Sequence, residues 1–309
     1  MRPSFIRCGK CLVKAICLNM NNFRSNLLRF KLITFDVTDT LLEYAMRPER
    51  YYAQTITNVL HPSMGLSIDE KSIANVFSSC FRTLKTKYPN FGHGRKQIEQ
   101  DVENWHWWWR MLVERVILDV TKRNRGDIPA ALLTKIADQL VEDYMSDTHG
   151  VCWKKRSGVD ELLRKLKYNQ EASEMSSVLG IVSNFDPRLE RILRNNQVYA
   201  TDGEQGMDFI VTSYEAGVEK PDPAIFGIAL EKAKYLANCN IHPHEALHIG
   251  NLCREDYLGA RAAGWHALLV NMTIKHKDEV FRRAVPVRHM FPDIPELLTC
   301  LDYDPTFPW

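Results

Sequence analysis

The sequence contains five short apolar segments, rich in Val, Ile and Leu, that end in or lead into small polar residues. These segments are LITF (32–35), VLGIVSNF (178–185), DFIVTSY (208–214), ALHIGN (246–251) and HALLVN (266–271). Such runs are typical of strands that are buried on both faces of a sheet. Helical stretches such as PDPAIFGIALEKAKYLA lie between them, so strands and helices alternate. This order predicts an α/β fold with a doubly wound parallel sheet.

The interval between the first and second strands is much longer than a crossover helix requires. From Asp36 to Ser183 it is 147 residues, which predicts an inserted domain. In DVENWHWWWRMLVERVILDV and IPAALLTKIADQLVEDYM the apolar residues keep helical spacing. We therefore predict a core domain over residues 31–45 and 151–309 and a helical domain over residues 46–150. The Trp-rich stripe is expected to pack inside a small bundle rather than to bind a ligand.

Residues 1–30 form a basic extension that contains no Asp or Glu. This pattern is compatible with a mitochondrial targeting segment and also with a plain basic tail. No apolar run approaches the roughly 20 residues that span a bilayer. We expect a soluble intracellular protein, cytoplasmic or mitochondrial, that does not act on membranes.

The balance of charge gives no indication of a nucleic-acid partner. The chain has 40 basic and 38 acidic side chains and a net charge of +2, although a small anionic substrate remains compatible with these values. The eight cysteines are scattered, which resembles reduced intracellular usage. CGKC at residues 8–11 has no second pair that would complete a tetrahedral zinc site.

Polar residues follow the strand ends or the turn before a helix. They are Asp36, Ser183, Asn184, Lys220, Asn251 and Asp256. The carboxyl ends of parallel strands meet at one edge of a sheet, so these side chains are expected to converge there. Each residue alone is more often a cap or a turn residue. Together they suit a phosphoryl group beside Mg²⁺, with Asp36 attacking phosphorus and Asp36 and Asp256 holding the metal. Oxygens of the phosphoryl group would be bound by Ser183, Asn184 and Lys220.

The segments FDVTDTLL, IVSNFD, VEKPDPAIF and LHIGNLCREDYLGARAAGWHALLV resemble the four motifs of the haloacid dehalogenase (HAD) superfamily of hydrolases. The resemblance covers about residues 31–300 and implies a Rossmann-like core with an inserted helical cap. It implies a Mg²⁺-dependent phosphatase in which Asp36 forms an aspartyl-phosphate that water then hydrolyses. Within the superfamily, the chain most resembles the HAD-like hydrolase domain-containing protein 3 group, which includes the insect rhythmically expressed gene 2 protein.

The first motif departs from that family at Thr38. Most family phosphatases have a second Asp there, which protonates the leaving oxygen and later deprotonates water. A threonine hydroxyl cannot act as a general acid at neutral pH, so a contribution of roughly 100- to 10,000-fold should be missing. Asp39 follows directly, where the family usually has glycine, but adjacent residues on an extended chain point to opposite sides. Asp39 is therefore expected to be a turn residue unless a local kink redirects it.

The fourth motif departs from the family at Asn251. The family usually has the sequence Gly-Asp here, whereas this chain has Gly-Asn. Asn keeps an oxygen but loses the charge, so Asn251 is expected to be a weak metal ligand. We therefore expect Mg²⁺ to bind less tightly than in a typical relative.

Substrate choice is expected to lie in the cap, where PNFGHGRKQ combines His93, Arg95 and Lys96. This loop either contacts an anionic substrate or is a solvated turn between helices.

Three kinds of function remain open from the sequence. The first is a weak or specialised phosphatase that acts on a small phosphorylated metabolite through Asp36. The second is a catalytically silent relative that binds a ligand or partner through the retained fold. The third is a carbon–halogen hydrolase, ranked last because its chemistry does not use the metal that Asp256 suggests. The oligomeric state is not fixed by the sequence.

Overall fold

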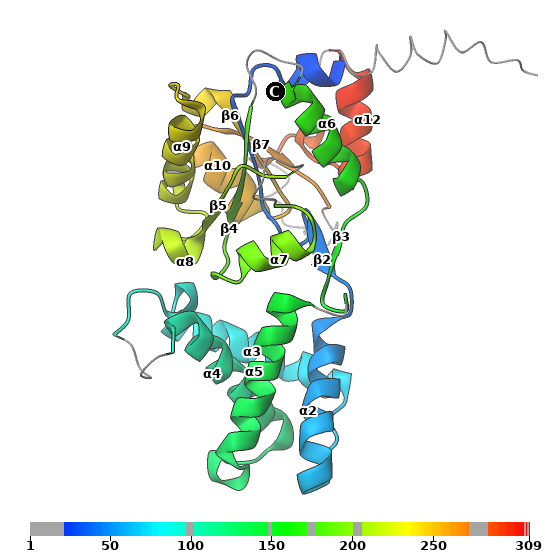
Figure 1. Cartoon of the computed structure of the whole chain (residues 1–309), viewed down its shortest axis with the longest axis vertical. Helices are drawn as coiled ribbons and strands as arrows, with labels where there is room; N and C mark the ends of the chain where they lie inside the picture. The colour runs from blue at the N-terminus through cyan, green and yellow to red at the C-terminus, as the bar shows by residue number, and fades with distance from the viewer. Residues whose placement is uncertain are drawn as a thin grey trace, which may run out of the picture.

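The computed structural model describes residues 22–96, 102–147, 150–171, 177–199, 206–271, 284–305, 307 and 309. Its centre is a parallel sheet in the order β5-β4-β1-β6-β7. The strands are β1 (Leu32–Phe35), β4 (Val178–Ser183), β5 (Phe209–Thr212), β6 (Ala246–Gly250) and β7 (His266–Leu269). These strands lie within the five predicted apolar segments, and the predicted α/β fold class is confirmed (Figure 1).

Both faces of this sheet are buried, as the apolar runs predicted. Ile33 and Leu179 belong to one hydrophobic cluster, whereas their neighbours Leu32 and Val178 belong to a second cluster. This alternation follows from the period of two along a strand. The first cluster includes residues of α6 (Val159–Glu171), α7 (Leu189–Asn195) and α12 (Ile294–Tyr303). The second includes residues of α9 (Pro223–Ala237) and α10 (Gly259–Ala262).

The chain order places a topological switch point beside β1. From β1 the chain continues to β4 and β5 on one side, and it later returns to form β6 and β7 on the other. In open α/β sheets, ligands bind beyond the carboxyl ends of the strands at such a point. The end of β1, where Asp36 lies, is therefore the place to look for a site.

Four long helices lie between β2 (Leu42–Tyr44) and β3 (Trp153–Lys155), which pair as an antiparallel ribbon. They are α2 (Pro48–Met64), α3 (Glu70–Lys87), α4 (Asn104–Thr121) and α5 (Ala130–Ser146). Figure 1 shows this bundle next to the sheet-containing part. Trp108 of α4 is buried in the bundle, as expected for the Trp-rich stripe, but the half-buried Trp109 contacts the segment just before α7, as described below.

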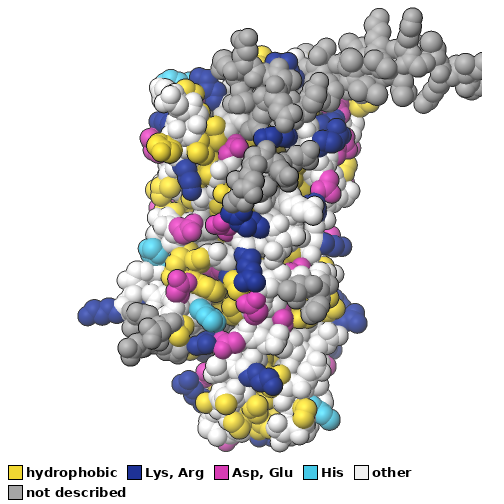
Figure 2. All heavy atoms as spheres, in the orientation of Figure 1, with side chains coloured by type: hydrophobic (Ala, Val, Ile, Leu, Met, Phe, Trp, Pro, Cys, Tyr) yellow, Lys and Arg dark blue, Asp and Glu magenta, His cyan; other side chains and the backbone are white. Residues whose placement is uncertain are grey.

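Short elements complete the chain. They are η1 (Asn90–Gly92), η2 (Arg125–Asp127), α8 (Ser213–Ala216), η3 (Pro243–Glu245), the π-helix η4 (Cys253–Leu258) and η5 (Val287–His289). None of the helices in these described ranges is long and apolar enough to cross a membrane. On the face shown in Figure 2, basic and acidic side chains are interspersed. CGKC and most of the basic extension lie outside the described residues.

Candidate active site

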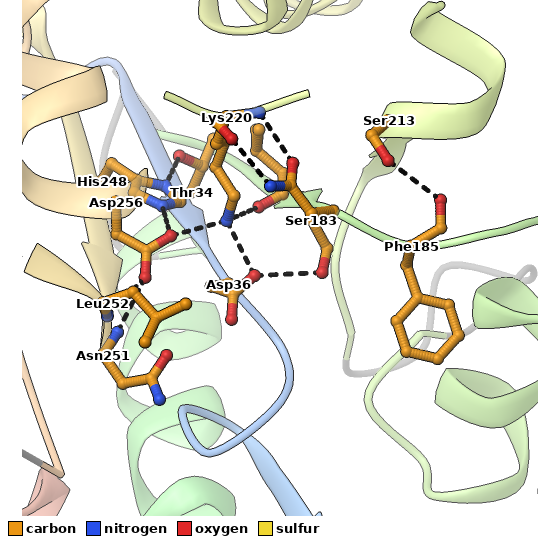
Figure 3. A network of polar contacts seen from close by, with 12 residues as sticks. Thr34, Asp36, Ser183, Phe185, Ser213, Lys220, His248, Asn251, Leu252 and Asp256 are labelled. Atoms are coloured by element: carbon orange, nitrogen blue, oxygen red, sulfur yellow. Dashed lines mark hydrogen bonds and ion pairs between the residues drawn. The ribbon is translucent and has the colours of Figure 1, made fainter. Parts of the chain in front are cut away.

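Four of the predicted residues meet in one buried cluster at the end of β1. The Lys220 ammonium donates to Asp36 Oδ1 at 2.7 Å, to Asp256 Oδ1 at 2.6 Å and to the carbonyl of Val182 at 2.8 Å. Ser183 Oγ donates to the same Asp36 oxygen at 3.0 Å. All four side chains are almost completely buried. As Figure 3 shows, the second oxygen of Asp36 has no partner within the cluster.

Asn184 has a different place from the one predicted. Its side-chain amide donates to the Lys220 carbonyl at 2.9 Å, and its oxygen accepts from the Lys220 backbone N–H at 2.7 Å. This pair of hydrogen bonds clamps the backbone that carries the Lys220 ammonium. Asn184 therefore positions Lys220, and direct binding of phosphate by its side chain stays a prediction.

Asp256 is fully engaged with protein donors, which the metal prediction did not anticipate. Its Oδ1 accepts from Lys220 and, at 3.2 Å, from His248 Nε2. Its Oδ2 accepts from the backbone N–H groups of Asn251 at 3.0 Å and Leu252 at 2.8 Å. A carboxylate has about four lone-pair sites, and here all are used. In this arrangement Asp256 anchors Lys220 and the loop after β6, and its role as a direct metal ligand stays a prediction that these hydrogen bonds do not support.

Gly250 permits this close packing. A Cβ atom built at Gly250 would lie 2.2 Å from Cγ of Asp256, so no larger residue fits while Asp256 keeps its place. The glycine that ends β6 is thus required by the approach of the Asp256 side chain to the backbone.

The cluster extends to two residues that sequence analysis did not assign to it. His248 Nδ1 lies 2.8 Å from Thr34 Oγ1, and both residues are completely buried. Because Asp256 accepts from Nε2, Nε2 carries the proton, and Nδ1 accepts from the Thr34 hydroxyl. Burial holds the pKa of His248 below its usual value, so the ring is neutral at pH 7. The available signal was two polar residues inside otherwise apolar strands, since Thr34 and His248 are direct neighbours in the register.

The two carboxylates that share Lys220 differ in acidity. Burial raises the pKa of Asp36 to about 6, against the opposing attraction of Lys220. Burial also acts to raise the pKa of Asp256, but Lys220 and His248 hold it well below the usual range. Four donors stabilise the Asp256 anion, whereas Asp36 has only two and is also repelled by Asp256. For Lys220, burial lowers the pKa, but both carboxylates together raise it above its usual value.

The oxygens left for a metal are those of Asp36 and Asn251. Asn251 Oδ1 is buried and has no hydrogen-bond partner, which is unusual for a buried polar atom. Within the described ranges, no three His, Cys, Asp or Glu side chains gather into a metal-binding group. Mg²⁺ commonly uses only one or two carboxylates and keeps several waters. One carboxylate oxygen and one amide oxygen therefore fit a weakly held Mg²⁺ ion.

Thr38 and Asp39 are placed differently around the turn after β1. Thr38 is half-buried, and no described residue forms a hydrogen bond with its hydroxyl. Asp39 has a left-handed φ of +58°, a region that glycine occupies most easily. Its carboxylate is 54% exposed and lies 3.7 Å from Arg156. The structure thus turns Asp39 toward Arg156, and Asp39 does not replace the missing acid in this conformation.

The predicted substrate loop packs against the core rather than against Asp36. His93 packs edge-on against Tyr214 of α8, with ring centroids 5.3 Å apart. The Arg95 guanidinium lies 4.0 Å from the centroid of the Tyr88 ring, and Lys96 is exposed. Nothing in the described contacts joins these three residues to the Asp36 cluster, so their predicted contact with substrate is not seen.

Replacing Lys220 by methionine is expected to lower the free energy of unfolding by about 3 to 5 kcal/mol, because two buried carboxylates then face each other without a cation. Urea unfolding followed by circular dichroism measures this. Addition of Asp256→Asn should recover part of the loss. A loss below about 1 kcal/mol would show that the ion pairs are not what holds this cluster together.

The raised pKa of Asp36 predicts a characteristic dependence of stability on pH. The folded state holds the proton more tightly than the unfolded chain, so the stabilisation is complete below the unfolded pKa of 3.8 and is lost as pH rises through about 6. Relative to Asp36→Asn, the wild-type protein should lose about 2 to 3 kcal/mol of unfolding free energy across this pH window. Unfolding of both proteins from pH 4 to 7 with EDTA present measures this difference. A difference independent of pH would contradict the raised pKa.

Solved structures with the same fold include enzymes of more than one kind. A HAD hydrolase of Bacillus subtilis whose crystal structure contains magnesium has a TM-score of 0.56 and 16% identity, covering 88% of this chain and 99% of that chain. A 2-haloacid dehalogenase of Pseudomonas syringae has a TM-score of 0.53 and 20% identity, covering 88% and 98%. A HAD phosphatase of Thermococcus onnurineus has a TM-score of 0.51 and 16% identity, covering 88% and 98%. At these identities the likeness concerns the fold alone.

Sequence relatives are closer. The rhythmically expressed gene 2 protein of Drosophila melanogaster is 33% identical over 276 residues, which cover 87% of this chain and 94% of that protein. HAD-like hydrolase domain-containing protein 3 of Bos taurus is 31% identical over 276 residues, covering 89% and 95%. Residues 30–264 also match the family of haloacid dehalogenase-like hydrolases as a whole, which confirms the resemblance drawn from the four motifs. The chain therefore belongs to the haloacid dehalogenase-like hydrolase family.

Proposed function

We propose that the protein is a phosphatase of restricted scope, which acts on a small phosphorylated molecule through an aspartyl-phosphate on Asp36. The observation that carries the proposal is the arrangement of the Asp36 carboxylate. One oxygen is held by Ser183 and Lys220, and the other has no protein partner in Figure 3. A carboxylate fixed by one oxygen at a switch point presents the other to a reacting phosphorus atom.

In the first step, the free oxygen of Asp36 attacks phosphorus, and the bond from phosphorus to the leaving oxygen breaks. The electron pair of that bond stays on the leaving oxygen. In the second step, water attacks phosphorus of the aspartyl-phosphate, the bond from phosphorus to the Asp36 oxygen breaks, and its electron pair restores the Asp36 carboxylate. Both protons of the water leave on the released phosphate, as H₂PO₄⁻. Lys220 and Ser183 keep Asp36 in place throughout by donating to its other oxygen, and the charge of Lys220 favours the negative charge of the phosphoryl group.

Mg²⁺ fits this proposal as a weakly held cofactor. Bound by Asp36 and Asn251, it would neutralise charge on the phosphoryl oxygens. Lys220 alone cannot balance both carboxylates and a phosphoryl group, so a second cation is useful here.

Thr38 restricts the leaving group. Without a protonated side chain at this position, departure is easiest for oxygens that are stable as anions, as in aryl and acyl phosphates. The same absence slows the attack of water, because no general base accepts its proton. The aspartyl-phosphate is therefore expected to persist longer than in a relative that has the second Asp.

The direct test combines phosphate release with trapping of the intermediate. The protein is incubated with Mg²⁺ and either acetyl phosphate or p-nitrophenyl phosphate, quenched in acid, digested and examined by mass spectrometry. A phosphoryl group on the peptide that contains Asp36, removed by hydroxylamine, is the expected result. Neither phosphate release nor a labelled peptide across a broad panel would contradict the proposal and favour a silent, ligand-binding relative.

A carbon–halogen hydrolase is the other enzymatic candidate. Its low rank rested on Asp256 as a sign of metal binding, and Asp256 is instead engaged by four protein donors. With these donors in place Asp256 is weaker support for a metal, and a halide leaving group also needs no acid. Release of halide from 2-haloacids should therefore be measured on the same preparation.

Replacing Asn251 by aspartate is expected to tighten binding of Mg²⁺ by at least about tenfold, since a second charge then faces the ion at close range. Isothermal titration with Mg²⁺ alone measures this without any substrate. Asp39→Asn is the matched control because its exposed carboxylate points toward Arg156. Equal affinities for wild type and Asn251→Asp would mean that residue 251 does not face the metal.

A further inference from the structure

A separate cavity of about 380 Å³ lies where the helical bundle meets the sheet-containing part of the chain. Its wall includes residues of β2 and β3, all four bundle helices and the segment after β4. Sites for small molecules commonly have volumes of about 300 to 1,000 Å³ and lie between domains. The cavity is therefore large enough for a small organic ligand.

Aromatic side chains make up much of the wall. They include Tyr44, Tyr52, Trp109, Trp153 and Phe185. Such walls favour flat apolar groups, which stack on or edge against the rings. Tyr144 also lines the cavity, and its buried hydroxyl has no hydrogen-bond partner in the described ranges. A polar atom of a bound molecule or a water could satisfy that hydroxyl after a small rearrangement.

One cation faces this aromatic space. Arg188 lines the cavity, although only 5% of its surface is exposed. Its Nε and Nη2 donate to Asp186 at 2.9 and 2.7 Å, and Asp186 also accepts from Trp109 Nε1 at 2.7 Å. The guanidinium lies 4.5 Å from the centroid of the Trp109 ring. These contacts fix the guanidinium plane before any ligand arrives.

The remaining nitrogen of Arg188 is open to a ligand. Among the described residues, Nη1 has no hydrogen-bond or ion-pair partner, and it is not sealed from solvent. A nearly buried, rigid guanidinium with one open edge is suited to an anionic oxygen. Glu49 also lines the cavity and repels a second anion, so a ligand with a single anionic group is favoured.

One segment of the chain contributes both to the cavity wall and to the Asp36 cluster. Phe185 lines the cavity and lies two residues after Ser183, whose hydroxyl holds Asp36. In Figure 3 the unpaired oxygen of Asp36 and the Phe185 ring both point toward the bottom of the view. Figure 3 also shows Ser183 and Phe185 on one chain segment, which joins the wall of the cavity to the Asp36 cluster.

We infer that this cavity binds the organic part of the substrate, an aromatic or similarly flat group whose carboxylate pairs with Arg188 Nη1. The inference rests on the proposed function only for the phosphoryl end of the molecule. Binding of the organic part requires no chemistry at Asp36, so it can be measured separately.

The experiment is calorimetric titration of the full-length protein with p-hydroxybenzoate and with its neutral analogue p-hydroxybenzamide. Saturable binding is expected, with the carboxylate favoured by at least about tenfold, because a charge-assisted hydrogen bond distinguishes the two. Arg188→Lys keeps a cation for Asp186 but lacks the open nitrogen, and should reduce this preference to below about threefold. Arg194→Lys, on α7 but outside the cavity wall, is the matched control and should preserve it.

A second pair of variants tests the location. Ser78 is exposed and lines the cavity, whereas the adjacent Ser79 is exposed but does not line it. Ser78→Phe should weaken both ligands by at least about tenfold because its ring occupies the space, and Ser79→Phe should leave both affinities unchanged. These surface changes keep the test usable if Arg188→Lys does not fold.

Three outcomes would overturn the inference: no saturable binding to the wild type, an equal affinity for the two ligands, or an equal effect of the two Ser variants. Asp36→Asn should bind p-hydroxybenzoate like the wild type. Binding without any phosphate release would contradict only the proposed function. Release of phosphate from acetyl phosphate without aryl binding would contradict only this inference.

Discussion

Asp36→Asn is expected to abolish phosphate release from acetyl phosphate and p-nitrophenyl phosphate, with a loss on the order of 10⁴-fold or more wherever the wild-type rate allows its measurement. The amide has nearly the shape of the carboxylate, but its oxygen is a poor nucleophile and cannot form an aspartyl-phosphate. The buried cluster should survive this change, since Lys220 keeps its ion pair with Asp256 and its hydrogen bond to Val182. Loss of activity would then report the loss of the nucleophile rather than unfolding.

The matched control for this variant is Asp39→Asn, three residues along the same turn. Asp39 is exposed and lies beside Arg156, so its neutralisation should change the rate by less than about twofold. Circular dichroism of both variants checks that they are folded. If Asp36→Asn and wild type release phosphate at the same rate, the activity belongs to another group or to a contaminant.

Thr38→Asp is expected to increase phosphate release from alkyl phosphates by roughly 100- to 10,000-fold, the usual contribution of a general acid. The gain should be smaller for aryl and acyl phosphates, whose leaving oxygens need no proton. The new carboxyl group displaces no hydrogen bond, since the Thr38 hydroxyl has none among the described residues. It enters a half-buried position, where space and partial solvation make substitution tolerable.

Thr38→Asn is the control that matches the size of Asp but cannot donate an acidic proton. The rate of phosphate release should therefore rise in Thr38→Asp and not in Thr38→Asn. The rate should also depend less on the pKa of the leaving group in Thr38→Asp, but not in Thr38→Asn. If both variants leave the rate unchanged while Asp36→Asn is inactive, proton transfer does not limit turnover. The slow step would then be closure of the bundle over the site or release of product.

The sequence determined which residues gather around Asp36. Parallel strands present their carboxyl ends at one edge, so Asp36, Ser183 and the loop after β6 had to meet there once the five apolar runs formed one sheet. The same logic explains the long interval between β1 and β4, which holds the four bundle helices. Periodicity and strand-end chemistry are local properties, and they can be read without coordinates.

Hydrogen-bond partners were decided only by the tertiary structure. Asn184 and Asp256 were predicted to contact phosphate and metal, but Asn184 clamps the Lys220 backbone and Asp256 is engaged by four donors. A hydrogen bond depends on distances within a few tenths of an ångström and on direction. Strand order alone does not fix side-chain positions to that accuracy.

The cavity lined by Arg188 was equally invisible in the sequence. Its wall combines residues from Tyr44 to Ile192, and the open edge of Arg188 exists because Asp186 and Trp109 occupy the other edge. The Trp-rich stripe was predicted to pack the bundle, which holds for Trp108 but not fully for Trp109. The sequence determined the fold and four members of the Asp36 cluster because these follow from local pattern. The tertiary structure decided their partners and the neighbouring cavity because these depend on how distant segments pack together.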